Sequence, residues 1–564
     1  MQTSWAFRNE HPLLAQEERF GDLAHSLNLS PLTVQLLLQR GFESCDQIRK
    51  FLFPSLDHLL DPFLVPGIRE SVDLVRKHLA AGSRILIHGD YDADGVTASA
   101  VLLRTFRKLR AEVFVFLPHR IHDGYGFTTA GIRFAREKEA NLIITVDCGI
   151  SAFKGIEEAR ALGMDVIVTD HHQISPQGLP QASAIIHPLI DVSGEPFKEL
   201  SAVGLAFKLS QALLGEESYE LLDLAALGTV GDLAPLAGEN RVIVKCGLEK
   251  LGEGRNLGLA SLGRQAKVHG KWNTTHLGFV LGPRVNASGR MDSADIALQL
   301  LVTENIKEAD SLARILEGEN KERQRLERQA VRQAVQKVEQ EVNFNRDRVI
   351  VVWDKNWHPG VIGIVASRLV EKFYRPAVVI SLDEHGQGKG SCRSIRHFNI
   401  FQALSQTAPL LVEYGGHEQA AGLKIQADQL EAFRRLINEN AFSTMESSTL
   451  IKSYDVDLEL KLSDLSRAFI EEIHLLEPFG LGNPKPVFLT RGLSIKGKPA
   501  SFGKDNLKFW VEDETATLEA LWYHPRSFPW DASERVDVIY TPDIRNWNGE
   551  IFPVLQVKDI KITR

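Results

Sequence analysis

The chain has 564 residues, enough for about three or four domains of typical size. Its hydrophobic content of 44% and charged content of 24% are those of an ordinary globular protein, and no run approaches the roughly 18 apolar residues of a membrane span. The net charge of −8 argues against a protein that coats nucleic acid, although an acidic metal site beside a local basic channel remains compatible with it. The start lacks signal-peptide features and the four cysteines form no C-x-x-C pair, so we expect a cytoplasmic chain with reduced thiols.

The first half of the chain predicts an α/β domain. Residues 1–70 are expected to form a helical segment, because leucine-rich turns such as LTVQLLLQRGF occur there. Over residues 71–305, short apolar runs alternate with helix-length segments, which is typical of βαβ units around a parallel sheet buried on both faces. The predicted strands are RILIH (84–88), EVFVFL (112–117), NLIITVD (141–147), DVIVTD (165–170) and SAIIH (183–187).

The second half predicts three further segments. Apolar residues recur every four positions among Glu, Arg and Gln, without Gly or Pro from Glu319 to His358, so residues 306–346 are expected to form a long connecting helix. A smaller α/β unit is expected over residues 347–445, beginning at RVIVVWD. Alternation in LKFWVED and VLQVKDIKI, with a hairpin at Asn546–Gly549, predicts a small β-barrel or sandwich over residues 446–564.

The stretch HGDYDADG at residues 88–95 has the D-x-D-x-D-G spelling of an EF-hand calcium loop. A calcium loop needs a bidentate Glu at its twelfth position, where this chain has Val101, and it needs a preceding helix. The preceding RILIH is a strand instead. We therefore interpret the carboxylates as a different metal site at the end of a strand.

Metal-binding residue types follow several predicted strands. In open parallel sheets, ligands bind outside the carboxyl ends of the strands, so these side chains are expected to meet in one crevice. A single Asp there is more often a helix cap, but capping needs only one side chain per helix. The candidates are His88, Asp90, Asp92, Asp94, Asp147, Asp170, His171, His172 and Asp232.

So many carboxylates in one crevice would repel one another unless cations held them together. Mixed imidazole and carboxylate donors without cysteine suit Mn²⁺, Mg²⁺ or Zn²⁺, and the mixture of nitrogen and oxygen favours Mn²⁺. The number of ligands is sufficient for two ions about 3.5–4 Å apart, the arrangement that hydrolyses phosphate esters.

Four motifs, HGDYDADG, VDCG, TDHH and GTVGDLAPL, resemble those of the DHH phosphoesterase superfamily. GKGSCRS (388–394) and EYGGHEQAAG (413–422) resemble the DHHA1 substrate-binding domain. With NWHPGVIGIVASRLVEKFYRP (356–376) and LEPFGLGNPKPVF (476–488), the chain resembles the RecJ family of 5′→3′ exonucleases specific for single-stranded DNA. The resemblance covers nearly the whole chain beyond the first sixty or so residues, and it implies that the C-terminal domain is an OB-fold.

The resemblance also implies roles for the metal-type residues. One ion, Mn²⁺ or Mg²⁺, would be held by His88, Asp92 and Asp147. The other would be held by Asp94, Asp147, His171 and Asp232, with Asp147 bridging the two. His172 would face the scissile phosphate, Asp90 would support the ligands, and Asp170 would orient an imidazole from behind.

The same resemblance implies the contacts that hold DNA. Arginine matches phosphate with a planar fork of donors, a terminal-phosphate pocket needs close backbone approach, and an aromatic ring stacks on any base. The implied DNA and phosphate contacts are Arg120, Tyr125, Asn286, Arg290, Ser391, Arg393, Gly415, Gly416 and His417.

The leading hypothesis is thus a two-metal exonuclease that degrades single-stranded DNA in recombination and repair. A DHH oligoribonuclease or cyclic-dinucleotide phosphodiesterase is the alternative enzyme, although such relatives are typically shorter. A replication scaffold without catalysis is the remaining alternative, and the complete ligand set argues against it. By analogy alone we expect a monomer, without membrane attachment, that works beside a helicase and a single-strand-binding protein.

Overall fold

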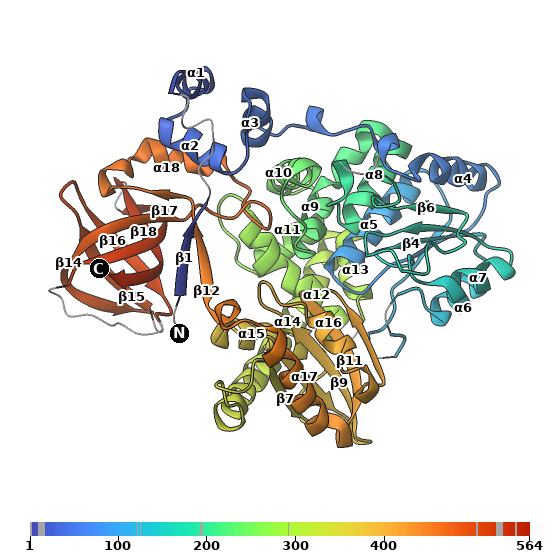
Figure 1. The fold of residues 1–564 in the computed structure, drawn as a ribbon. Helices are drawn as coiled ribbons and strands as arrows, with labels where there is room; N and C mark the ends of the chain where they lie inside the picture. The colour runs from blue at the N-terminus through green and yellow to red at the C-terminus, as the bar shows by residue number, and fades with distance from the viewer. Residues whose placement is uncertain are drawn as a thin grey trace.

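The computed structural model describes residues 3–8, 17–120, 122–124, 126–191, 196–291, 293–503, 506–525, 534–547 and 550–563. The long helix α14 joins two α/β units, and a C-terminal barrel lies to one side of them with the N-terminal helices above it (Figure 1). In the described part of the chain, no helix is long and apolar enough to cross a membrane.

The first unit is built on a five-stranded, all-parallel sheet in the order β3-β2-β4-β5-β6. All five strands that the sequence predicted are confirmed: β2 (Ile85–His88), β3 (Val113–Phe116), β4 (Leu142–Val146), β5 (Asp165–Thr169) and β6 (Ala184–Ile186).

Helices bury both faces of this sheet, which explains why its strands are continuously apolar. Ile85 and Ile87 pack into the core on one side, whereas Leu86 between them packs into the core on the other. The first side is covered by α4 (Ile68–Ala80), α5 (Ala93–Lys108) and α8 (Ala202–Leu214), and the second by α6 (Thr129–Glu137) and α7 (Phe153–Ala161).

A helical subdomain follows the sheet and leads into the connecting helix. Its helices are α9 (Leu222–Gly231), α10 (Gly238–Glu253), α11 (Leu257–Gln265), the π-helix η6 (His276–Leu281), α12 (Gly282–Met291) and α13 (Asp295–Val302). The predicted long helix is confirmed as α14 (Ile306–Glu341), whose N-cap Asn305 accepts hydrogen bonds from the N–H groups of Lys307 and Glu308.

The second α/β unit has a mixed five-stranded sheet in the order β10-β11-β9-β8-β7, in which only β7 and β8 pair in parallel. Its strands are β7 (Ile350–Asp354), β8 (Ala377–Leu382), β9 (Gln387–Arg393), β10 (Glu413–Gly416) and β11 (Ala420–Gln426). The helices of this unit are α15 (Ile362–Phe373), α16 (Ile400–Ser405) and α17 (Leu430–Thr444).

The C-terminal unit is a closed barrel, because β14 pairs with both β15 and β17. The predicted hairpin is confirmed by the pairing of β17 with β18, although its tip at 548–549 lies outside the described residues. The elements are β13 (Leu458–Glu459), α18 (Arg467–Leu475), β14 (Phe488–Phe502), β15 (Asn506–Glu512), β16 (Thr517–Tyr523), β17 (Val536–Trp547) and β18 (Glu550–Ile562).

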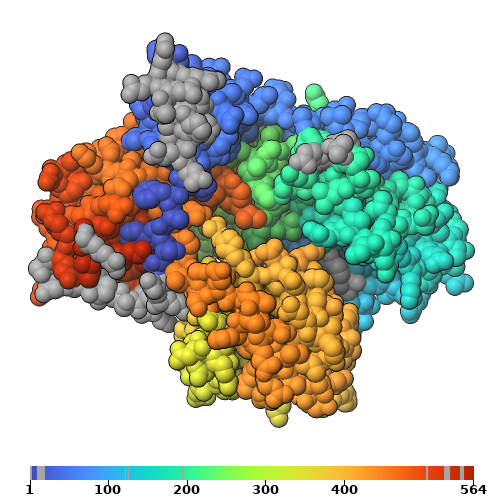
Figure 2. Space-filling view, viewed as in Figure 1, coloured from blue at the N-terminus to red at the C-terminus, as the bar shows by residue number. Residues whose placement is uncertain are grey.

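Residues 23–52 of the N-terminal segment pack against this barrel, whereas residues 56–68 pack against the first α/β unit (Figure 2). Leucine and isoleucine side chains of α2 (Pro31–Gln39) and α3 (Cys45–Leu52) belong to the barrel's hydrophobic core, next to α1 (Glu17–Leu27). Glu472 of α18 accepts hydrogen bonds from the backbone N–H and the hydroxyl of Ser30, the N-cap of α2. The sequence did not predict β1 (Thr3–Phe7), which pairs in parallel with β12 (Lys452–Val456).

Candidate metal and phosphate site

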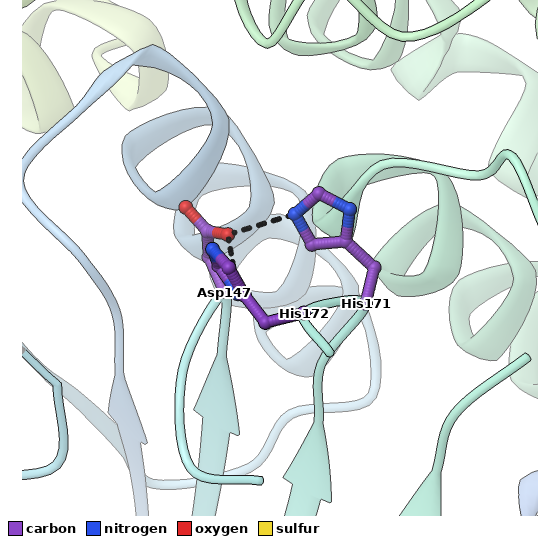
Figure 3. Close-up of side chains that lie close together, drawn as sticks. All are labelled: Asp147, His171 and His172. Carbon is purple, nitrogen blue, oxygen red and sulfur yellow. Dashed lines mark ion pairs between the residues drawn. The ribbon is translucent and has the colours of Figure 1, made fainter. Parts of the chain in front are cut away.

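The carboxyl ends of β2, β4 and β5 carry the metal-type residues, as the strand pattern predicted. His171 lies at the centre of the group: its Nε2 is 3.3 Å from Asp147 Oδ1 and 3.8 Å from Asp94 Oδ2. Its Nδ1 is 4.0 Å from Oδ2 of Asp232, the C-cap of α9. The imidazoles of His171 and His172 both turn toward Asp147 (Figure 3). The structure thus brings together the four residues expected at one ion.

A second group of oxygens lies beside the first. Carboxylate oxygens of Asp90, Asp92 and Asp147 lie within 4.8 Å of one another. The resemblance placed His88 with Asp92 and Asp147, and gave Asp90 only a supporting position. In this arrangement Asp90 is close enough to act as a ligand itself.

His88 is held in a tight aromatic pocket. Its imidazole is fully buried, with ring centroids 5.2 Å from Phe116 and 5.0 Å from Phe127. A Cβ added at Gly131 would lie 2.4 Å from His88 Nε2, so only glycine leaves room for the ring. Nε2 is buried without a hydrogen-bond partner among the described residues. A buried nitrogen in that state is suited to a metal ion.

Local backbone structure fixes the carboxylates. Asp147 has a left-handed backbone (φ +62°), which is uncommon for a residue with a side chain. Asp92 is the N-cap of α5, and its Oδ1 accepts hydrogen bonds from the N–H groups of Asp94 and Gly95. The oxygens of Asp94 accept the N–H groups of Ala202 and Val203 at the start of α8, at 2.8 Å each.

The electrostatics of these carboxylates indicate that a cation belongs here. Burial and the neighbouring carboxylates raise the pKa of Asp94 to about 7 and the pKa of Asp232 to about 9. The same causes raise the pKa of Asp90 and Asp147 well above the usual range. His171 Nε2 and Asp90 Oδ1 are, like His88 Nε2, buried without a hydrogen-bond partner in the described part of the chain. Mixed nitrogen and oxygen donors with unmet bonding capacity fit Mn²⁺ or Mg²⁺.

Asp170 lies behind His172 and contacts its ring. Its Oδ1 lies 2.7 Å from His172 Nδ1 and accepts the N–H groups of His171 and His172, while Oδ2 accepts the N–H of Ile150. Burial raises the pKa of Asp170, but the hydrogen bond and charge of His172 lower it to about 2. Burial lowers the pKa of His172, and Asp170 more than offsets this, raising it to about 9.

A cluster of arginines from both α/β units lies near these carboxylates. Burial lowers the pKa of Arg290 to about 10, and repulsion from Arg120, Arg323 and Arg393 contributes. Arg290 Nη1 donates a hydrogen bond to the carbonyl of Gly360, just before α15. Arg120 lies over the ring of Tyr91, 4.7 Å from its centroid. Cations that repel one another in this way form a favourable site for phosphate anions.

The residues expected to bind a terminal phosphate occupy the facing edge of the second unit. The His417 imidazole stacks on that of His172, with a distance of 6.3 Å between the ring centroids and an angle of 17° between the ring planes. Arg393 Nη1 donates to Ser391 Oγ at 3.3 Å. Gly415 is exposed, whereas a Cβ at Gly416 (φ +136°) would lie 2.5 Å from the Ala420 carbonyl oxygen.

Two further residues, Asn286 and Tyr125, were expected to contact DNA. Asn286 Oδ1 accepts the N–H of Ala93 at 2.7 Å, so this side chain supports the loop that carries the carboxylates. Tyr125 lies outside the described residues.

Sequence reasoning missed two residues that shape the site. His187, fully buried at the end of β6, has Nε2 at 2.8 Å from the His172 carbonyl oxygen, and its Nδ1 accepts the N–H of Leu189. The rule that ligands bind at the carboxyl ends of parallel strands could have identified His187, because this residue ends the predicted strand SAIIH. Tyr91 lies within HGDYDADG, and its ring packs against the Arg120 guanidinium; the sequence pattern gave it no role.

Comparisons with known proteins agree with this arrangement. Three family models match: DHH family, N-terminal domain (residues 84–229), DHHA1 domain (346–441) and RecJ OB domain (456–559). Among relatives, the single-stranded-DNA-specific exonuclease RecJ of Bacillus subtilis is 39% identical over 553 residues, covering 97% of this chain and 70% of the relative. RecJ of Escherichia coli is 34% identical, in a match that covers 92% of this chain and 94% of the relative.

Solved structures give the same result. The crystal structure of RecJ from Thermus thermophilus with Mn²⁺ aligns with a TM-score of 0.85 and 30% identity, covering 99% of this chain and 80% of that one. The corresponding structure with Mg²⁺ aligns with a TM-score of 0.80 and 29% identity, covering 99% and 78%. The chain therefore belongs to the RecJ family of single-stranded-DNA-specific exonucleases.

Proposed function

We propose that the chain removes nucleotides from the 5′ end of single-stranded DNA by metal-dependent hydrolysis, in recombination and repair. The observation that carries this proposal is the gathering of His171 with Asp94, Asp147 and Asp232 at the carboxyl end of a sheet whose facing unit supplies Arg393 and His417.

In this proposal, Asp94, Asp147, His171 and Asp232 hold one Mn²⁺ or Mg²⁺ ion. Asp147 and Asp92, whose carboxylates lie close together, hold a second ion with His88, which the family resemblance adds to this set. Asp90 either orients the ligands of this second ion or binds the ion directly. When bound, such ions lower the pKa of a water and stabilise charge on phosphate oxygens. The complete ligand set is why a scaffold without catalysis is not favoured.

The protein's own side chains bind and orient the substrate. Asp170 contacts Nδ1 of His172 and fixes the orientation of its ring, and in this proposal the imidazole faces the scissile phosphate. Arg120 and Arg290 neutralise the charge of the DNA phosphate backbone. The pocket that binds the 5′-terminal phosphate of the DNA is formed by Ser391, Arg393 and His417. A pocket for one terminal phosphate on one side of the cleavage centre is the physical basis for exonuclease polarity.

The domain division at residues 70, 305, 346 and 445 is also part of the proposal, supported by the ranges of the three family models. Action as a cytoplasmic monomer beside a helicase and a single-strand-binding protein is supported only by family membership.

The test uses oligonucleotides labelled at either end, single- or double-stranded, as DNA and RNA, with Mn²⁺, Mg²⁺ or chelator. We expect immediate release of the 5′ label as a mononucleotide from single-stranded DNA, late release of the 3′ label, and no cleavage in chelator. Equal rates on duplex ends, or cleavage in chelator, would contradict the proposal.

Variants separate catalysis from binding. Asp147→Ala should abolish cleavage while DNA binding, measured by fluorescence anisotropy, remains. The matched control is Asp73→Ala, which removes an exposed carboxylate on α4 and should change neither.

A further inference from the structure

A cavity of about 590 Å³ lies next to Asp232 along the chain, and the site described above does not use it. Its wall begins at Val230 and Leu233, on either side of Asp232 along the chain. α10, the π-helix η6 and the loop 477–485 that enters the barrel complete it.

Hydrogen bonds fix the loop that forms one wall of this cavity. The N–H of Leu236 donates to the carbonyl of Leu481 at 2.7 Å, and Thr274 Oγ1 donates to the carbonyl of Phe479 at 2.7 Å. The loop is therefore fixed across the end of α9, and a ligand would meet a preformed surface.

Large apolar side chains line the cavity and face solvent. Phe279 is 79% exposed, Leu233 is 69% exposed and Leu481 is 60% exposed. Single exposed apolar residues are normal, but several around one concavity indicate a binding surface. The rings of Trp272 and Phe479 also contribute to the walls.

Lysines accompany these aromatic rings. Lys245, Lys271 and Lys485 line the cavity against two carboxylates, Glu249 and Glu477. Burial lowers the pKa of Lys245, and repulsion from Lys271, which lines the same cavity, adds to the effect.

Cations also accompany aromatic rings on the ribbon that β1 and β12 form beside the barrel. Lys485 and Lys452 both contribute to lowering the pKa of Lys558, whose largest cause is burial. Lys452 lies over the ring of Tyr454, and Lys561 of β18 lies over Trp5 of β1, 4.1 Å from its centroid. Alternating cations and aromatic rings are what single-stranded nucleic acid binds without regard to sequence.

We propose that this cavity is a subsite for single-stranded DNA on the 3′ side of the scissile bond, and that the strand continues from it to the β1–β12 ribbon. The proposal rests on the proposed function. Bases would stack on Phe279 and pack on Leu233, while Lys271 and Lys485 contact phosphates. The route passes Trp5 and Tyr454, and not the exposed barrel ring Trp510, which lies between the ion pairs Lys496–Glu512 and Lys508–Glu519.

The test compares 5′-phosphorylated single-stranded DNA substrates of about 4 and about 16 nucleotides, with Mn²⁺ present. Phe279→Ala should raise KM about 5-fold to 150-fold on the long substrate, the range of one lost base–aromatic stack, and leave KM unchanged on the short one. Lys271→Ala and Lys485→Ala should each reduce the slope of log affinity against log salt by about 0.7 on long single-stranded DNA. The control is Phe53→Ala, which removes a ring that is 58% exposed but lies outside the cavity.

The outcomes distinguish this proposal from the function on which it rests. If the wild type cleaves neither substrate, the proposed function fails. If it cleaves both but Phe279→Ala has wild-type KM on long DNA, the subsite is refuted. Equal loss on both lengths, or a length-dependent loss in Trp510→Ala and not in Phe279→Ala, refutes it as well.

Discussion

The space around His88 gives a sharp prediction for the substitution Gly131→Ala. The new Cβ would lie 2.2 Å from His88 Cδ2 and 2.4 Å from Nε2, whereas ordinary contacts begin near 3.4 Å. The ring therefore has to retreat by about 1 Å, but Phe116 and Phe127 pack against it. Metal–ligand distances tolerate about 0.2 Å, so a ligand displaced this far no longer binds well. A 1 Å misplacement costs about 100-fold in rate, and overpacking costs about 1–3 kcal/mol of stability.

Three measurements on Gly131→Ala check this reasoning: kcat on single-stranded DNA, Mn²⁺ affinity by calorimetry, and the free energy of unfolding. The control is Gly318→Ala in α14, where an added Cβ meets nothing within 4 Å. It should stabilise the chain by about 0.5–1 kcal/mol through helix propensity and leave activity unchanged. Wild-type kcat and Mn²⁺ affinity in Gly131→Ala would show that His88 is neither confined nor a ligand.

Metal binding, pH and the N-terminal helices provide further tests. Mn²⁺ at about 100 times its Kd should stabilise the wild type by about 2.7 kcal/mol, and Asp147→Asn should abolish this gain; an equal rise in Tm for both proteins would contradict it. Burial raises the pKa of Asp223 to about 6, so its ionisation destabilises the fold as pH rises from about 4 through 6. Asp223→Asn should thus be more stable than the wild type by up to about 3 kcal/mol at pH 8 and equal near pH 4, as urea melts at both values would show. Glu472→Ala removes the acceptor for Ser30 and should cost about 1.5–3 kcal/mol, with faster hydrogen exchange in α2; unchanged exchange there would refute the coupling.

The strands and the position of the site could be predicted because they depend on short-range pattern. An apolar run such as NLIITV followed by Asp147 specifies a buried strand and the side chain at its end. Parallel pairing then brings Asp147 to the same edge as Asp170 and His171 without further information. The same logic could have included His187, which ends the neighbouring strand β6.

Other features depend on packing between distant segments, which periodicity does not encode. The pairing of β1 with β12 joins residues about 450 positions apart, and no local pattern in Thr3–Phe7 reveals its partner. The proximity of Asp90 to Asp92 and Asp147 depends on the turn of the loop before α5. The cavity beside Leu233 needs the loop 477–485, which lies far along the chain.

The attachment of the N-terminal helices to the barrel has a consequence for synthesis. Leu52 of α3 and Phe488 of β14 share one hydrophobic core but are separated by roughly 440 residues, which take about 20–90 s to translate at 5–20 residues per second. Throughout that time the apolar faces of α2 and α3 remain exposed, because the strands that bury them have not yet been made. Residues 31–52 are thus made long before the strands that bury them, and a newly made chain depends on residues 488–562 to protect these helices from aggregation.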